Sequence, residues 1–289
     1  MKIPSRRIVG TLGVLALVAA GALVAQLPDL AAGGLLHPFR RRVGRPAPEG
    51  CVEVSFEGAG VALRGWRCQA RKARRGTLVY LHGVADNRGS GAGIVRRFVG
   101  RGFDVIAYDS RAHGDSEGAA CTYGYFEKED LRRVLDTASP GPIVLLGTSL
   151  GAAVALQEAA GDPRVSAVVA AETFSDLRTV ARERAPFFLT ESTIREAFSL
   201  AEERGRFEVA AVSPVAAARR ITVPVLLVHG ALDIDTPPEH SRQVLGALQG
   251  PKRLILVPEV GHNKSLAGDV WPQIEAWIDE AIGPADEHR

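Results

Sequence analysis

Short apolar segments recur along the chain between residues 77 and 257, and glycine, proline or polar residues bound them. Continuous apolar runs of this length are typical of strands buried on both faces of a parallel sheet. The predicted strands are residues 77–82, 103–108, 143–147, 165–171, 225–229 and 253–257. Predicted helices include residues 126–138, 150–160, 238–248 and 270–282. This alternation of strand and helix predicts an α/β domain with a mostly parallel, doubly wound sheet.

Two further runs open the domain, at residues 51–57 and 61–68, with Gly58-Ala59-Gly60 between them. A short glycine-rich turn between two such runs predicts an antiparallel β-hairpin. No internal repeat and no second linker follows the hairpin. We therefore expect residues 51–289 to form one domain.

The segment 172–220 separates two predicted strands by much more than a short crossover. We expect it to fold over the functional site as a small helical cap. It carries several aromatic residues, and Phe174, Phe187 and Phe188 are candidates to line an apolar substrate pocket. The alternative is that these rings only pack the cap onto the rest of the domain.

The N-terminal segment has a different character from the rest of the chain. Residues 8–27 are uncharged and mostly apolar, and as a helix they would span about 30 Å, the thickness of the bilayer core. This predicts a transmembrane helix or signal anchor, preceded by a tail at residues 1–7. The proline- and glycine-rich residues 28–50 would then be a linker. A cleaved signal peptide, which would make the protein secreted, and a buried soluble helix are the alternatives.

Basic residues flank the apolar segment on both sides. Lys2, Arg6 and Arg7 precede it, and a group of arginines within residues 40–45 follows after a gap. The two sides are nearly equal in positive charge, but the N-terminal charges lie closer. We therefore expect a single-pass membrane protein with its N-terminus inside and its domain outside the cytoplasm.

Composition excludes several classes of protein. Apolar residues make up 46% of the chain and charged residues 24%, which is ordinary for a packed globular protein. The net charge of +2 offers no concentrated basic face for nucleic acid. Three cysteines are too few for a disulfide-framework miniprotein, and neither Cys-x-x-Cys nor His-Glu-x-x-His occurs. We therefore expect no nucleic-acid partner, no metal and no cofactor.

The sequence Gly147-Thr148-Ser149-Leu150-Gly151 follows an apolar predicted strand and opens a predicted helix. A Gly-x-Ser-x-Gly pattern in this position is typical of a nucleophile elbow. The turn is so tight that bulky neighbours would clash, and it holds the serine hydroxyl out at the carboxyl end of the sheet. Ser149 is therefore the candidate nucleophile.

A serine hydroxyl needs a base to take its proton, and the base is usually a histidine oriented by a carboxylate. His262 is the best candidate because it lies in a loop after the last predicted strand. Asp233 follows the preceding strand and is the preferred acid, with Asp235 as its rival. Other histidines, including His82, are interpreted as structural or lie away from suitable strand ends.

The tetrahedral intermediate of acyl transfer needs two hydrogen-bond donors. The backbone N–H of Leu150 is one candidate because it begins the helix after the nucleophile. The loop after Leu81-His82-Gly83 supplies the other, and the Val84 amide is the candidate. These two amides would form the oxyanion hole.

The chain resembles the α/β-hydrolase superfamily over residues 51–282. The resemblance rests on the serine elbow, on the order Ser149, Asp233, His262, and on further stretches of sequence. These are His82-Gly83, Tyr108-Asp109-Ser110-Arg111-Ala112-His113-Gly114-Asp115-Ser116-Glu117-Gly118, His229-Gly230-Ala231-Leu232-Asp233 and Gly261-His262. Within the superfamily the chain is similar to bacterial membrane-linked esterase-like hydrolases related to the fermentation–respiration switch esterase. It also resembles animal hydrolases that share this core.

Together these features predict a serine hydrolase that cleaves small-molecule carboxylic esters or thioesters through an acyl-serine intermediate. A serine peptidase or a perhydrolase of the same fold is an alternative, because the elbow does not specify the leaving group. A non-catalytic, membrane-anchored binding protein that keeps the fold is a second alternative.

The three cysteines allow one structural prediction. If the hairpin turn is centred on Ala59-Gly60, Cys51 and Cys68 lie directly opposite each other. Cysteines in such a pair are close enough for a disulfide, which would persist only in an oxidising compartment. A shift of register by one residue would instead place them on opposite faces. Cys121 would be left as a free thiol.

Overall fold

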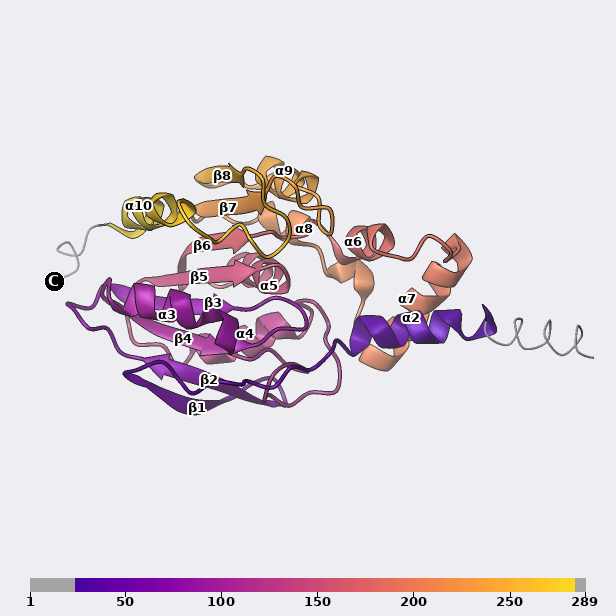
Figure 1. The fold of residues 1–289 in the computed structure, drawn as a ribbon, viewed down its shortest axis with the longest axis horizontal. Helices are drawn as coiled ribbons and strands as arrows, with labels where there is room; N and C mark the ends of the chain where they lie inside the picture. Colours follow the sequence, from indigo (N-terminus) through magenta and orange to yellow (C-terminus); the bar gives the residue numbers. More distant parts are fainter. Residues whose placement is uncertain (1–23, 284–289) are drawn as a thin grey trace, which may run out of the picture.

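Figure 1 shows the fold in a computed structural model, which describes residues 24–283. The described chain contains an eight-stranded sheet in the order β1-β2-β4-β3-β5-β6-β7-β8. Strands β1 and β2 pair antiparallel, β2 joins β4 antiparallel, and β3 to β8 are parallel. The strands are β1 (Cys51–Glu57), β2 (Ala62–Cys68), β3 (Gly76–Leu81), β4 (Phe103–Tyr108), β5 (Ile143–Thr148), β6 (Val165–Ala171), β7 (Val225–Gly230) and β8 (Lys252–Val257). The predicted α/β class and mostly parallel sheet are confirmed.

Helices cover both faces of this sheet. The α-helices are α2 (Leu27–Leu36), α3 (Ala92–Val99), α4 (Glu127–Leu135), α5 (Leu150–Ala159), α6 (Leu177–Glu183), α7 (Glu191–Gly205), α8 (Pro214–Ala218), α9 (Glu239–Ala247) and α10 (Val270–Ile282). Two short 3₁₀ helices are η1 (Arg88–Gly91) and η2 (Val209–Ala211). Helices α3 and α10 pack on one face, and α4, α5, α8 and α9 pack on the other. The central strands are therefore buried on both sides, which explains their continuous apolar runs.

The first hairpin has the predicted register. Cys51 lies opposite Cys68 with their Cα atoms 4.1 Å apart, and the two form a disulfide. Cys121 is a buried free cysteine. The prediction for the cysteines is confirmed, because one turn geometry fixes which residues of the two strands meet.

The predicted transmembrane helix is wrong. Within residues 24–283, no helix is long and apolar enough to cross a membrane. Most of the segment 8–27 lies outside the described residues, and α2 begins at its last position. This helix occupies part of the predicted linker and packs beside α7 (Figure 1). Its Ala32 and Leu36 are buried in an apolar cluster with cap residues, whereas its Leu30 is exposed.

The segment between β6 and β7 contains α6, α7, η2 and α8. Helices α6 and α7 lie beyond the carboxyl ends of the central strands, next to α2 (Figure 1). The buried rings of Phe174, Phe198 and Phe207 belong to the same apolar cluster as α2. The carboxyl end of the sheet is therefore enclosed by a helical layer that two distant parts of the chain build together.

Candidate active site

Ser149 lies in the sharp turn between β5 and α5, with φ of 49° and ψ of −111°. Few residues other than glycine adopt a positive φ, so the surrounding packing has to hold this conformation. A Cβ atom on Gly147 would lie 2.3 Å from the carbonyl carbon of Gly151, and one on Gly151 would lie 2.2 Å from the Leu81 carbonyl oxygen. Only glycine fits at both positions, so the elbow glycines are required by close backbone approach.

The structure brings Ser149, His262 and Asp233 together in one hydrogen-bonded chain. The Ser149 hydroxyl lies 3.1 Å from Nε2 of His262, and Nδ1 of His262 lies 2.7 Å from Oδ2 of Asp233. Because an ionised carboxylate only accepts hydrogen bonds, Nδ1 carries the proton and Nε2 is free to accept one from Ser149. This is the arrangement in which histidine can act as a general base toward serine.

Asp233 is almost completely buried and receives several hydrogen bonds besides that of His262. Oδ1 accepts the backbone N–H of Asp235 at 3.1 Å and of Thr236 at 2.9 Å, and Nε2 of His229 lies 3.2 Å from Oδ2. Burial acts to raise the pKa of the Asp233 carboxyl. The hydrogen bonds from His229, His262 and the Thr236 amide outweigh burial and hold that pKa well below its usual range. Asp233 is therefore ionised at neutral pH, and Asp235 contributes its backbone to the turn.

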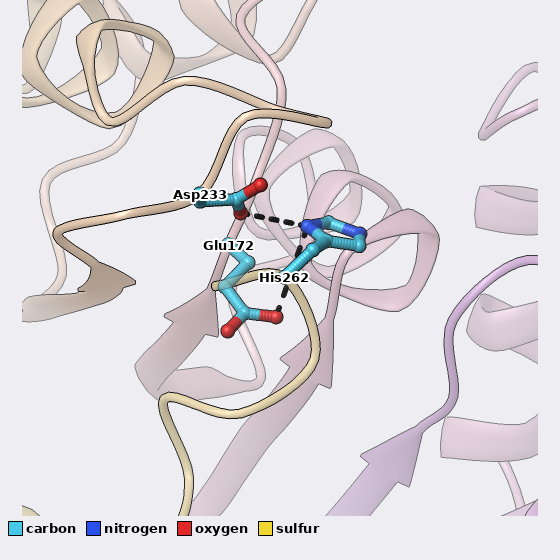
Figure 2. A group of neighbouring side chains, drawn as sticks. All are labelled: Glu172, Asp233 and His262. Atoms are coloured by element: carbon cyan, nitrogen blue, oxygen red, sulfur yellow. Dashed lines mark hydrogen bonds and ion pairs between the residues drawn. The ribbon is translucent and has the colours of Figure 1, made fainter. Parts of the chain in front are cut away.

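Glu172 is a second buried carboxylate beside His262 that the sequence analysis did not single out. It follows β6, has a φ of 56° and is 1% exposed. Its carboxylate accepts the backbone N–H groups of Asn263, Lys264 and Ser265, the last two at 3.1 and 2.9 Å. Figure 2 shows the carboxylates of Glu172 and Asp233 both directed toward Nδ1 of His262. Glu172 thus fastens the loop that carries His262 to the end of β6.

Glu172, Asp233 and His262 also offer three ligand atoms within 4.8 Å of one another (Figure 2). However, these ligand atoms already take part in hydrogen bonds. Nδ1 of His262 is bonded to Asp233, and Glu172 accepts three backbone N–H groups. Since a metal would have to displace these bonds, the chemistry of the donor set fits an oriented histidine better than a metal site.

The two predicted oxyanion donors both adjoin the nucleophile. Leu150 follows Ser149 directly and begins α5. Val84 follows Gly83, where an added Cβ atom would lie 3.5 Å from the Cβ of Ser149. Gly83 and Val84 also line a polar cavity of about 670 Å³ that reaches Glu172. The two backbone segments needed for an oxyanion hole therefore flank Ser149.

Arg184 is a further residue that the sequence analysis missed. It caps the C-terminal end of α6 and reaches the loop after Asp233. Its Nε donates to the Asp235 carbonyl at 2.7 Å, and one terminal nitrogen, Nη2, donates to the Thr236 hydroxyl. The same Nη2 lies 3.5 Å from Nε2 of His262. The Arg184 guanidinium group thus lies at the edge of the His262 ring.

An apolar cavity of about 470 Å³ lies between α2, α6 and α7. Of the three predicted pocket residues, Phe188 lines this cavity and is 59% exposed. Phe187 is fully exposed, and Phe174 is buried among the residues that pack the cap. The cavity walls include Leu27, Leu30, Leu35, Tyr123, Leu177, Val180, Leu189, Ile194 and Phe198, together with Arg184. One wall therefore comes from α2, a segment predicted to be a linker.

Comparisons with known proteins agree with this fold. A family model for the alpha/beta hydrolase fold matches residues 76–198. The protein YfhR of Escherichia coli K12, itself named as uncharacterised, is 28% identical over 276 residues, which cover 89% of this chain and 90% of YfhR. YqkD of Bacillus subtilis, also named as uncharacterised, is 30% identical over 199 residues, which cover 65% of each chain.

Solved structures with the same fold include an esterase and an animal hydrolase. The Pyrococcus furiosus esterase Pf2001 superposes with a TM-score of 0.68 at 22% identity, covering 86% of this chain and 99% of the esterase. Mouse alpha/beta hydrolase domain-containing protein 10 gives 0.61 at 24% identity, covering 79% of this chain and 99% of its own. The chain therefore has the α/β-hydrolase fold, and this fold supports a hydrolase. The narrower resemblance to membrane-linked esterases stays a prediction.

Proposed function

We propose that this protein is a serine hydrolase that cleaves small-molecule carboxylic esters or thioesters through an acyl-Ser149 intermediate. The observation that carries the proposal is the continuous hydrogen-bonded chain from the Ser149 hydroxyl through His262 to Asp233. The elbow geometry at Ser149 supports it, because a strained turn of this kind presents a serine at the end of the sheet. The likeness of the fold to the Pf2001 esterase is in keeping with it.

In this mechanism His262 takes the Ser149 proton through Nε2 while Ser149 attacks the carbonyl carbon. Asp233, held ionised, keeps the Nδ1 proton in place and stabilises the imidazolium that forms. The amides of Val84 and Leu150 donate to the oxyanion. His262 then protonates the leaving group, and it activates a water molecule that releases the acid from Ser149.

The apolar cavity between α2 and the cap gives the acyl chain of the substrate a place to bind. Its walls are aliphatic and aromatic, and its volume of about 470 Å³ lies within the range of small-molecule sites. Arg184 belongs both to this cavity and to the surroundings of His262, so the cavity adjoins the catalytic residues. Hydrolysis should therefore depend on acyl length, with a preference for chains that fill the cavity.

Labelling by a fluorophosphonate probe and turnover of p-nitrophenyl esters of graded acyl length test the proposal. The wild-type protein is expected to be labelled at Ser149 and to hydrolyse at least one ester of the series. Ser149→Ala should abolish both while keeping the wild-type circular dichroism spectrum. Wild-type turnover by a folded Ser149→Ala protein, or no labelling of the wild type, would reject the mechanism.

We also propose that the domain works in an oxidising compartment outside the cytoplasm. The Cys51–Cys68 disulfide supports this, since disulfides are rare in reducing cytosol. Cell fractionation with thiol-specific labelling tests it. A domain that is found only in the cytoplasm, with Cys51 and Cys68 reduced, would contradict the proposal.

A further inference from the structure

Arg184 occupies a position between the catalytic histidine and the apolar cavity. Nη2 lies 3.5 Å from Nε2 of His262, the nitrogen that also faces the Ser149 hydroxyl. The side chain lines the cavity between α2 and the cap. The guanidinium group therefore lies at the side of the cavity that is next to His262.

The hydrogen-bond partners of Arg184 are neutral. They are the Asp235 carbonyl, the Thr236 hydroxyl and the His262 ring, and Arg184 forms no ion pair within residues 24–283. Its other terminal nitrogen, Nη1, makes no hydrogen bond within that part of the chain. The residue is exposed to solvent, so its charge and the two N–H groups of Nη1 are available to a ligand.

Three carboxylates near Arg184 are already engaged, and the carboxylate of Asp235, whose carbonyl Arg184 contacts, forms no ion pair with Arg184. Glu183, the residue before Arg184, pairs with His240 at 2.7 Å. Asp233 is bonded to His262, and Glu172 to the loop that follows His262. The site thus holds a guanidinium that is fixed through hydrogen bonds to Asp235, Thr236 and His262 and lacks an anionic partner in the described chain. A guanidinium group that is held in one orientation and has free N–H groups typically recognises carboxylate and phosphate oxygens.

We propose that Arg184 binds an anionic group, a carboxylate or a phosphate, that the substrate carries close to its scissile ester. This inference rests on the proposed function and narrows it, because the substrate then combines an apolar chain for the cavity with a negative charge beside the reacting carbonyl. Neutral esters are hydrolysed by the same triad but lack the contact with Arg184. The negative charge can lie on the alcohol part or on the acyl part of the ester. In either position it would bind Arg184 through the same charge and hydrogen bonds.

Two matched pairs of substrates test the proposal and distinguish these two sources. The first pair is the hexanoyl ester of 4-hydroxybenzoate and that of its methyl ester, which differ in the charge of the leaving group. The second pair is mono-p-nitrophenyl glutarate and p-nitrophenyl pentanoate, which differ in the charge of the acid. Each substrate is measured with the wild type, Arg184→Gln and Arg184→Lys. Arg182→Gln is the matched control, because Arg182 lies on the same helix and pairs with Glu191 at 3.1 Å.

In at least one pair, Arg184→Gln is expected to lower kcat/KM for the anionic ester by about tenfold or more relative to its neutral partner. This decrease in kcat/KM should arise mainly from a higher KM for the anionic ester. Arg184→Lys should recover part of it because the charge remains, and added salt should weaken the wild-type preference. Arg182→Gln should leave the ratio within each pair unchanged.

Equal losses for the charged and neutral members of both pairs would overturn the inference. That result would mean that Arg184 only fastens the cap to the loop at residues 235–236. Absence of any hydrolysis together with absence of fluorophosphonate labelling would instead reject the proposed function, and this inference with it. Labelling of Ser149 therefore distinguishes the two failures.

Discussion

The carboxylate of Glu172 lies 4.0 Å from Nδ1 of His262 and is bonded to the backbone amides of the three residues that follow the histidine. In the proposed mechanism Glu172 is a positioning residue, since it would act on the reaction through His262. Asp233 orients the imidazole ring from one side, while Glu172 fixes the backbone from which the ring projects. We therefore expect the distance from His262 to Ser149 to depend on both carboxylates.

Glu172→Gln should therefore reduce kcat more than it affects KM. A glutamine keeps one oxygen acceptor but cannot accept all three N–H groups as a carboxylate does, so the His262 loop is expected to shift. Small displacements of a catalytic group reduce turnover by about 10- to 100-fold. Steady-state kinetics on the best p-nitrophenyl ester measures the effect, and the rate of fluorophosphonate labelling should fall in parallel.

Glu127→Gln is the matched control for this variant. Glu127 is also 1% exposed and accepts three hydrogen bonds, two of them from the Thr122 and Gly124 amides, but its partners lie outside the triad. Both variants should unfold at lower temperature than the wild type. If Glu127→Gln lowers kcat of the folded enzyme as much as Glu172→Gln does, Glu172 has only a general structural role.

Asp233→Asn should impair turnover far more than Asp235→Asn. An asparagine at position 233 can no longer hold the required tautomer of His262, and the equivalent change in a serine protease costs about 10⁴-fold in turnover. Asp235 is exposed and contributes its backbone N–H and carbonyl, which the substitution keeps. Comparison of kcat for the two variants decides between the carboxylates, and a larger loss from Asp235→Asn would contradict the assignment of the acid.

Removing the disulfide should destabilise the domain without changing the active site. Cys51 and Cys68 are separated by 17 positions, and closing a loop of this size stabilises a protein by about 3 kcal/mol. The Cys51→Ala, Cys68→Ala double variant should therefore unfold at lower denaturant concentration. Alkylation of the unfolded, unreduced wild type should modify one thiol, that of Cys121. Three modified thiols would show that the bridge is absent.

Stability should fall on mild acidification because of His113. Burial, and secondly the neighbouring His82, lower the pKa of His113 to about 4 from 6.5. As the pH falls below 6.5, His113 of the unfolded chain binds a proton, whereas His113 of the folded protein binds it only near pH 4. The free energy of unfolding therefore decreases between pH 6.5 and about pH 4. A shift of this size corresponds to about 3 kcal/mol. Urea unfolding between pH 7 and pH 4.5 should give a shallower dependence for His113→Asn, and identical slopes would refute the prediction.

Much of the architecture followed from local sequence patterns. Each apolar run between residues 77 and 257 became a strand with its ends shifted by at most one residue, because a strand buried on both faces requires continuous apolar side chains. The register of Cys51 with Cys68 followed in the same way from the position of one turn. The transmembrane helix was the wrong prediction. Composition also misplaced residues 28–36, where proline and glycine suggested a linker, because these residues form most of α2, whose buried side chains pack against the cap.

What the sequence by itself determined is the nucleophile elbow and the chain order of Ser149, Asp233 and His262, because each is marked by its neighbours at the end of a strand. Glu172, Arg184 and the α2 wall of the cavity became visible only in the tertiary structure. Glu172 meets Asn263 across 91 positions, and Arg184 meets His262 across 78. Contacts over such separations leave no local pattern, since they depend on how the sheet and the cap bring distant loops together. Local sequence thus marks the candidate catalytic residues, whereas the residues expected to position them and to select the substrate are brought together only by the fold.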